Sequence, residues 1–180
     1  MKNFSTEECK SFMAAPGKKK LLALDTNLLF DLAADKDFAH TFREVYQERG
    51  FALVVPPTAI QELAYCALEK QCAETPLALK ALQPLRSWNL SPFDLKSVGH
   101  SITEQFAEKL LCAGLLPEGE FHDGLILAET ALANIPALVT SDADLLYIEA
   151  GKLAVQFEAA DLPPVQICHL KLLLKAMVPK

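Results

Sequence analysis

The sequence predicts an α/β fold, a three-layer α/β/α sandwich with a central, mostly parallel sheet of four to five strands. Short apolar runs of strand length recur along the 180 residues, and stretches with helical spacing separate them. The predicted strands lie at 21–24, 51–55, 136–140 and 153–157. Strand, helix and strand in succession imply parallel crossovers, and helices cover both faces of such a sheet.

Composition and length narrow the class of protein. The chain is 51% hydrophobic and 22% charged, as is ordinary for a compact globular protein. No apolar stretch approaches the roughly 20 residues that span a membrane, and no signal peptide is evident, so we predict a cytoplasmic protein without membrane contact. The five cysteines show no paired spacing and predict neither disulfides nor a zinc knuckle. We predict a loose lead-in at 1–20 and one domain at 21–180.

The first strand, at 21–24, ends in the polar triplet Asp25, Thr26 and Asn27. Ligands of open α/β sheets bind outside the carboxyl ends of the strands, so Asp25 stands where chemistry usually occurs. Asp25 or Thr26 also suits the cap of a helix that begins near Leu28. The residues alone leave both roles open.

Glu62 lies in the first turns of a helix that follows the second strand. Thr58 and Gln61 match a capping box, which predicts that this helix runs over 59–73. Apolar side chains cover most of its circumference, so Glu62 is either a solvated residue opposite Ile60 or part of a site. A preceding helix is predicted over 37–49.

The next helix begins near Glu120, ends before Pro136 and carries Asp123 in its first turns. The helix dipole favours a carboxylate there, so Asp123 also has a structural explanation. Gly124 costs about 1 kcal/mol against alanine in a helix, which predicts a close approach to the sheet or to a ligand. Residues 75–118, before this helix, are predicted to form a helical insertion, with helices around 76–86 and 97–113.

The strand at 136–140 leads directly into Ser141, Asp142 and Asp144. Ser141 is predicted to cap the next short helix with Asp144 three residues later, which leaves Asp142 free to face Asp25. An apolar helix over 165–177 then closes the fold.

Four carboxylates would therefore meet at one edge of the sheet. Like charges in one site raise each other's pKa, and divalent cations relieve the repulsion. Hard oxygen ligands select Mg²⁺ or Mn²⁺, and such ions activate a water and stabilise the leaving oxygen of a phosphodiester. The carboxylates are those of Asp25, Glu62, Asp123 and Asp142.

The segments LLALDTN, AIQELA, HDGLILA and LVTSDADL resemble, in order, the four acidic blocks of PIN-domain nucleases. The resemblance extends over 21–157. It implies metal-dependent cleavage of single-stranded RNA, with Asp25, Glu62, Asp123 and Asp142 as the catalytic and metal-binding residues. The supporting polar residues would be Thr26, Asn27, Ser141 and Asp144.

Other functions fit these residues less well. Residues 75–118 are longer than the matching connection in the compact toxin members of the family, so an antitoxin-type partner lacks support, and a homodimer stays open. A non-catalytic PIN-fold module that binds RNA or protein is the main alternative, with its acids kept as caps. A P-loop ATPase is excluded because the GxxxxGK motif is missing. A haloacid-dehalogenase-type phosphatase would need an aspartate where Asn27 stands.

Overall fold

The computed structural model describes residues 20–69 and 73–177, so the predicted lead-in falls outside the described residues except for Lys20. The strands are β1 (Leu21–Leu24), β2 (Ala52–Val55), β3 (Leu90–Pro92), β4 (Ala137–Thr140) and β5 (Gln166–His169). The helices are α2 (Thr26–Ala33), α3 (Asp37–Glu48), α4 (Pro57–Leu68), α5 (Thr75–Leu82), α6 (Ser97–Cys112), α7 (Phe121–Leu132), α8 (Ala143–Tyr147), α9 (Ala150–Ala159) and α10 (Leu170–Met177).

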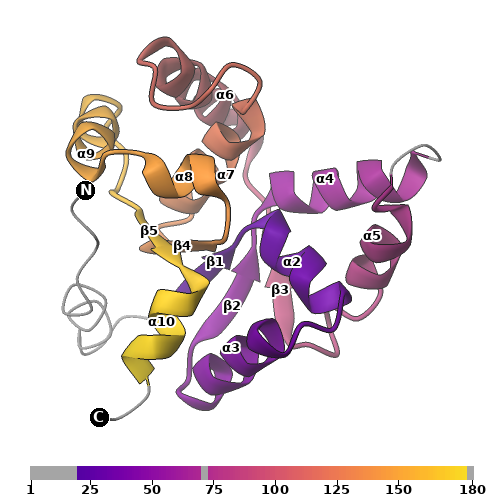
Figure 1. Cartoon of the computed structure of the whole chain (residues 1–180). Helices are drawn as coiled ribbons and strands as arrows, with labels where there is room; N and C mark the ends of the chain where they lie inside the picture. Colours follow the sequence, from indigo (N-terminus) through magenta and orange to yellow (C-terminus); the bar gives the residue numbers. More distant parts are fainter. Residues whose placement is uncertain (1–19, 70–72, 178–180) are drawn as a thin grey trace.

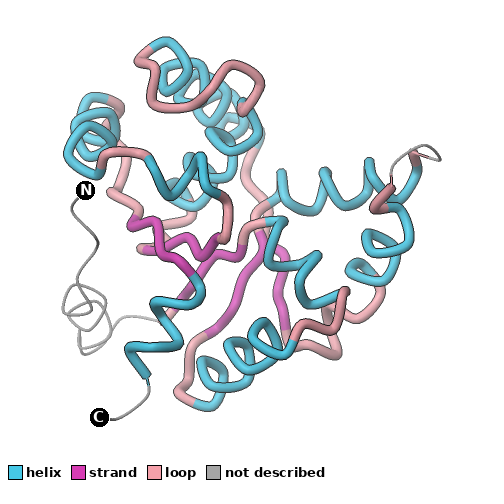
Figure 2. The backbone as a smooth tube through the Cα atoms, in the orientation of Figure 1, coloured by secondary structure: helices cyan, strands magenta, loops and turns pink. Residues whose placement is uncertain are grey.

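The described strands form a single parallel sheet in the order β3-β2-β1-β4-β5. Figures 1 and 2 show α2–α5 on one side of the sheet and α6–α9 on the other. β1 is aliphatic throughout and β4 is aliphatic up to Thr140, as expected for strands with helices on both faces of the sheet. The predicted fold class, an α/β sandwich around a parallel sheet, is confirmed. No helix among the described residues is long and apolar enough to cross a bilayer.

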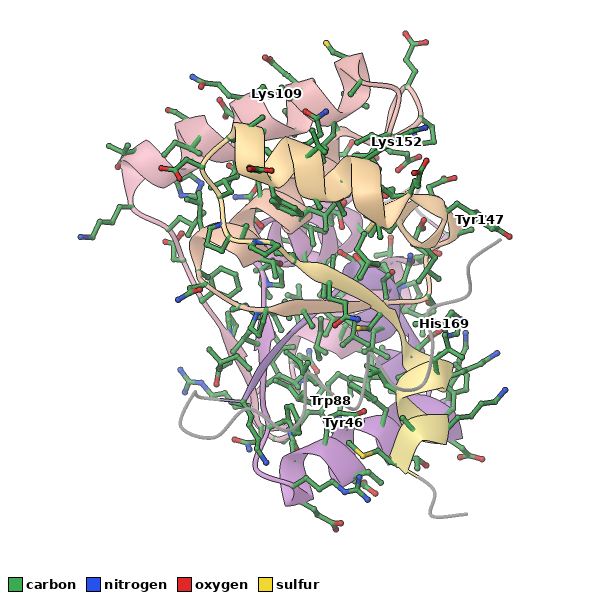
Figure 3. The ribbon with its side chains drawn as sticks, turned by 90° about the vertical axis from the view of Figure 1, so that its left-hand side faces the viewer. Tyr46, Trp88, Lys109, Tyr147, Lys152 and His169 are labelled. Carbon is green, nitrogen blue, oxygen red and sulfur yellow. The ribbon has the colours of Figure 1, made fainter. Side chains whose placement is uncertain are left out.

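The C-terminal part of the sheet differs from the prediction. Residues 153–157 were expected to form a strand but belong to α9, where Leu153 and Phe157, four residues apart, are both buried on one helical face. Residues 165–177 were expected to form one helix but contain β5, paired with β4, followed by α10. The hydroxyl of Tyr46 on α3 donates a hydrogen bond to the carbonyl of Leu173 at 3.2 Å and fastens α10 to the fold (Figure 3).

The start of α4 also corrects the prediction. The helix begins at Pro57 after Pro56, which occupies the N-cap position, and it ends at Leu68. Thr58 lies inside the first turn and is buried, so the expected capping box with Gln61 does not form. Proline at the first helical position is favoured because its missing N–H would have no partner within the helix.

Gly124 lies at a close contact between α6 and α7. A Cβ atom at this position would lie 2.8 Å from both the Cα and the Cβ atom of Ala107. The close approach that the sequence predicted is therefore to a neighbouring helix and not to the sheet or a ligand. This contact sets α7, which carries Asp123, at a fixed distance from α6.

We expect Gly124→Ala to lower the free energy of unfolding by up to about 2 kcal/mol. Overpacking costs about 1–3 kcal/mol, and the gain of about 1 kcal/mol in helix propensity offsets part of it. Gly151→Ala on α9 is the matched control, because its Cβ would meet only a flexible glutamate oxygen at 3.8 Å. Urea denaturation should show Gly151→Ala as neutral or stabilising. Equal effects of the two changes would contradict the close packing of α6 on α7.

Candidate active site

A cavity of about 640 Å³ opens at the carboxyl ends of β1 and β4. The chain leaves β1 toward β2 on one side and returns to β4 on the other, so the crevice lies where the strand order reverses. Its lining includes six of the eight residues that the sequence singled out, namely Asp25, Thr26, Asn27, Glu62, Asp123 and Asp142. Ser141 and Asp144 are exposed and are not among the lining residues.

Asp25 is buried at the end of β1, with a relative exposure of 2%. One carboxylate oxygen accepts a hydrogen bond from the backbone N–H of Thr26 at 2.7 Å and so caps α2, and the other accepts from the hydroxyl of Thr140 at 2.6 Å. Burial raises the pKa of Asp25, and the charges of Glu62 and Asp142 contribute to the rise. The two hydrogen bonds lower the pKa in part, and the result is a pKa of about 6. The capping role and the site position therefore coexist in one residue.

Thr140 joins the two central strand ends, and sequence reasoning did not single it out. Its hydroxyl donates to Asp25 and accepts from the backbone N–H of Asp142 at 2.8 Å. The side chain is fully buried. A threonine that closes an aliphatic strand directly before an acidic block was the available signal.

Asp142, and not Ser141, caps α8. One oxygen of Asp142 accepts from the backbone N–H groups of Asp144 at 2.7 Å and Leu145 at 3.4 Å. The other oxygen accepts from the side-chain amide of Asn27 at 3.1 Å. The helix starts one residue later than predicted, so the expected pairing of Ser141 with Asp144 does not form and Asp142 is held rather than free.

Glu62 turns into the cavity with its side chain 26% exposed. One oxygen accepts a hydrogen bond from the hydroxyl of Thr26. The other lies 3.2 Å from Nδ1 of His122, a mostly exposed residue that sequence reasoning passed over. Its position directly before Asp123 was the only sequence signal for His122.

Among the four acids, Asp123 is the one with a buried side-chain oxygen, Oδ2, that has no hydrogen-bond partner. Burial, together with the negative charges of Asp25, Asp142, Glu120 and Glu62, raises its pKa to about 8. A buried carboxylate beside other carboxylates is a strained arrangement unless it holds a proton or a cation.

The donor set fits a hard divalent cation, because all four side chains offer carboxylate oxygens. As the side chains stand, however, no group of three or more His, Cys, Asp or Glu residues in the described chain is positioned to hold a metal ion. Asp25, Glu62 and Asp142 are turned toward internal partners, which are Thr140, Thr26 and Asn27 respectively. Coordination would exchange part of these hydrogen bonds for bonds to the ion.

A buried link joins the two helices that carry Glu62 and Asp123. Glu129 of α7, 2% exposed, accepts hydrogen bonds from the backbone N–H of Thr58 at 3.0 Å and from its hydroxyl at 2.7 Å. Proline at the N-cap of α4 offers no side-chain cap, so Glu129 serves the open N-terminus of α4 from a different helix. Burial raises the pKa of Glu129.

Comparisons with known proteins agree with this architecture. A family model described as PIN domain matches residues 22–151. A chain in the crystal structure of VapBC2 from Rickettsia felis bound to a DNA fragment from their promoter is 16% identical, with a TM-score of 0.54 over 82% of this chain and 98% of that one. A chain of VapBC-1 from nontypeable Haemophilus influenzae is 18% identical, with a TM-score of 0.49 over 84% and 98%. The curated proteins gave no match. Because the family model spans well over half of the residues, this chain belongs to the PIN-domain family.

Proposed function

We propose that the protein is a divalent-metal-dependent endoribonuclease that cleaves single-stranded RNA. Asp25, Glu62, Asp123 and Asp142 would hold Mg²⁺ or Mn²⁺ in the cavity. The observation that carries the proposal is the buried, unpartnered oxygen of Asp123 in a cavity lined by the other three carboxylates. Membership of the PIN-domain family supports it, because proteins of this family are generally nucleases.

The protein's own residues prepare the site for the ion. Thr140 fixes Asp25 to the start of Asp142, and Asn27 holds the second oxygen of Asp142, so two of the acids have set positions. Asp123, with a pKa of about 8, carries a proton at neutral pH in the ion-free protein, and that proton must leave when a cation binds. A bound divalent ion would supply an activated water and neutralise the charge that develops on the phosphodiester.

A non-catalytic module is the second candidate, because three of the acids have structural partners. Asp25 caps α2, Asp142 caps α8 and Glu62 accepts from Thr26. Asp123 has no such role, and a module without a metal leaves its buried oxygen unexplained. The observation at Asp123 therefore favours the nuclease.

The partners and the location of the protein stay predictions. The likeness to VapBC2, at 16% identity, shows the fold alone. An antitoxin-type partner and a homodimer therefore stay predictions. The cytoplasmic location stays a prediction as well.

The test combines metal binding with cleavage. Titration of Mn²⁺ should release binding heat, and a single-stranded RNA oligomer should be cut with Mg²⁺ or Mn²⁺ but not with a chelator. Asp142→Asn should cut about 10²-fold more slowly. Its fold should survive because asparagine is also a good N-cap. Asp144→Asn, two residues away and outside the cavity, is the matched control and should keep both properties.

Two outcomes would refute the proposal. Cleavage that persists in chelator would mean a metal-independent ribonuclease. A protein that neither binds Mn²⁺ nor cuts any of several RNA oligomers would be the non-catalytic module.

A further inference from the structure

The cavity has an apolar part that metal-assisted hydrolysis does not use. Phe30, Tyr65 and Cys66 line it together with the acids. Phe30 lies three residues after Asn27 on α2, and Tyr65 lies three residues after Glu62 on α4, so on each helix a polar site residue and an aromatic ring share one face. Three residues, about 4.5 Å along the helix axis, separate the members of each pair. Figure 1 shows α2 and α4 starting side by side at the end of the sheet.

The two rings differ in how they are held. Phe30 is half-buried and packs against the hydrophobic core, whereas Tyr65 is 68% exposed. Leu68, one turn further along α4, is 83% exposed but does not line the cavity. Tyr65 is therefore set apart from an ordinary exposed apolar residue by its place beside the acids.

The charges around the cavity make apolar contacts necessary for binding a nucleic acid. None of the described residues that line it is lysine or arginine, and His122 pairs with Glu62. Basic side chains, which supply most of the affinity of proteins for nucleic acids, are therefore missing from the described lining of the cavity. Stacking on the two aromatic rings is an attractive contact that the cavity offers to a nucleobase without any basic side chain.

We propose that Phe30 and Tyr65 form a nucleobase subsite, in which an unpaired base next to the scissile phosphate stacks on the aromatic rings while that phosphate lies at the acids. This inference rests on the proposed function. A base and its phosphate are joined through a single ribose, a separation comparable with the three-residue spacing between Tyr65 and Glu62 on α4. Every base has a π-face, so the subsite accepts different sequences, and it rejects a duplex because paired bases are already stacked.

The experiment compares intact single-stranded RNA oligomers with oligomers that have one abasic nucleotide at successive positions. Equilibrium Kd values are measured by fluorescence anisotropy with Ca²⁺ in place of Mg²⁺, and a gel checks that the oligomer stays whole. In wild-type protein, loss of one base should raise Kd by about 5- to 100-fold. Tyr65→Ala should raise Kd for the intact oligomer by a similar factor and remove the difference between intact and abasic oligomers. Tyr65→Trp should retain that difference, and Leu68→Ala, the matched control, should behave as wild type.

The outcomes separate this proposal from the proposed function. If cleavage fails but Kd still responds to the missing base through Tyr65, the nuclease is wrong and the subsite stands. If the protein cleaves RNA while Tyr65→Ala leaves the intact and abasic Kd values as in wild type, the subsite is wrong and the nuclease stands. Unchanged Kd values together with a dimer that Tyr65→Ala converts to a monomer would show the ring to be a protein contact, which also overturns the subsite.

Discussion

Asp123→Asn should reduce metal-dependent cleavage by about 10²- to 10³-fold while making the ion-free protein more stable at pH 7. The Asp123 side chain that the substitution changes is partly buried, has one buried oxygen without a hydrogen-bond partner, and lies beside other carboxylates. At pH 7 the folded protein must bind a proton at Asp123 that the unfolded chain releases, whereas an asparagine amide is neutral in both states and carries no such cost. We expect a gain of about 1–3 kcal/mol in the free energy of unfolding after allowance for solvent screening in an open cavity.

The pH dependence of stability gives a second measurement on the same variant. The pKa of Asp123 is about 8 and that of Asp25 about 6 in the folded protein, against a model value of 3.8 for each. The folded state thus holds protons that the unfolded chain releases, and the stability that they provide is complete below pH 3.8. It is lost as the pH rises to about 8, so the ion-free protein should weaken over this range. Asp123→Asn should flatten the upper part of the decline.

Chemical denaturation at several pH values, with and without Mn²⁺, measures both effects. Wild-type protein should gain stability from Mn²⁺, and more at pH 8 than at pH 6, because metal ligands must be deprotonated. Asp123→Asn should lose most of this gain. A variant that is less stable than wild type without the ion would show that Asp123 has a structural role and that the metal site is wrongly assigned.

Glu129→Ala should cost about 3 kcal/mol of stability, the largest effect expected outside the cavity. The change leaves the N–H and hydroxyl of Thr58 buried without an acceptor, and each unsatisfied group costs about 1–3 kcal/mol. It also removes a negative charge from the N-terminus of α4. Because Glu129 links α4 to α7, we further expect weaker Mn²⁺ binding although Glu129 is not one of the proposed ligands.

Glu129→Gln separates the contact from the volume of the side chain. The glutamine has one acceptor oxygen and can satisfy only one of the two Thr58 donors, so a cost of about 1 kcal/mol is expected. A double-mutant cycle with Thr58→Val should give a coupling free energy of about 1 kcal/mol or more. Independent, additive effects of the two substitutions would mean that the buried link does not hold the helices together.

The central strands β1, β2 and β4 could be predicted because a short apolar run that ends at turn or polar residues is typical of a buried strand. β3 could not, since its three residues include Ser91 and Pro92 and it exists only through pairing with β2. One helix was expected where the structure has β5 followed by α10, and the reason is different. An apolar stretch without a breaker does not show where a short buried strand gives way to a helix.

The candidate site, like the fold, could be predicted from the sequence only in part. The meeting of the four acids in one cavity could be predicted because topology alone brings strand ends and helix starts to one edge of the sheet. Their hydrogen-bond partners could not, because Thr140 lies 115 residues from Asp25, and Thr58 lies 71 residues from Glu129. Glu129 did carry a signal, as a carboxylate within the apolar helix LILAETAL, but a sequence does not name the donor that makes such burial tolerable.

The reversal of strand order between β1 and β4 has a consequence for how the protein folds. β1 and β2 pair across about thirty residues, and Glu62 reaches Thr26 across 36, whereas Asp25 meets Thr140 across 115. Contacts of long sequence separation carry the greater loop-closure entropy and form late. One half of the acid cluster can therefore assemble early, and the half with Asp123 and Asp142 must wait for β4 to dock. Like charges oppose that last step, so we expect divalent cations to slow unfolding more than they speed folding.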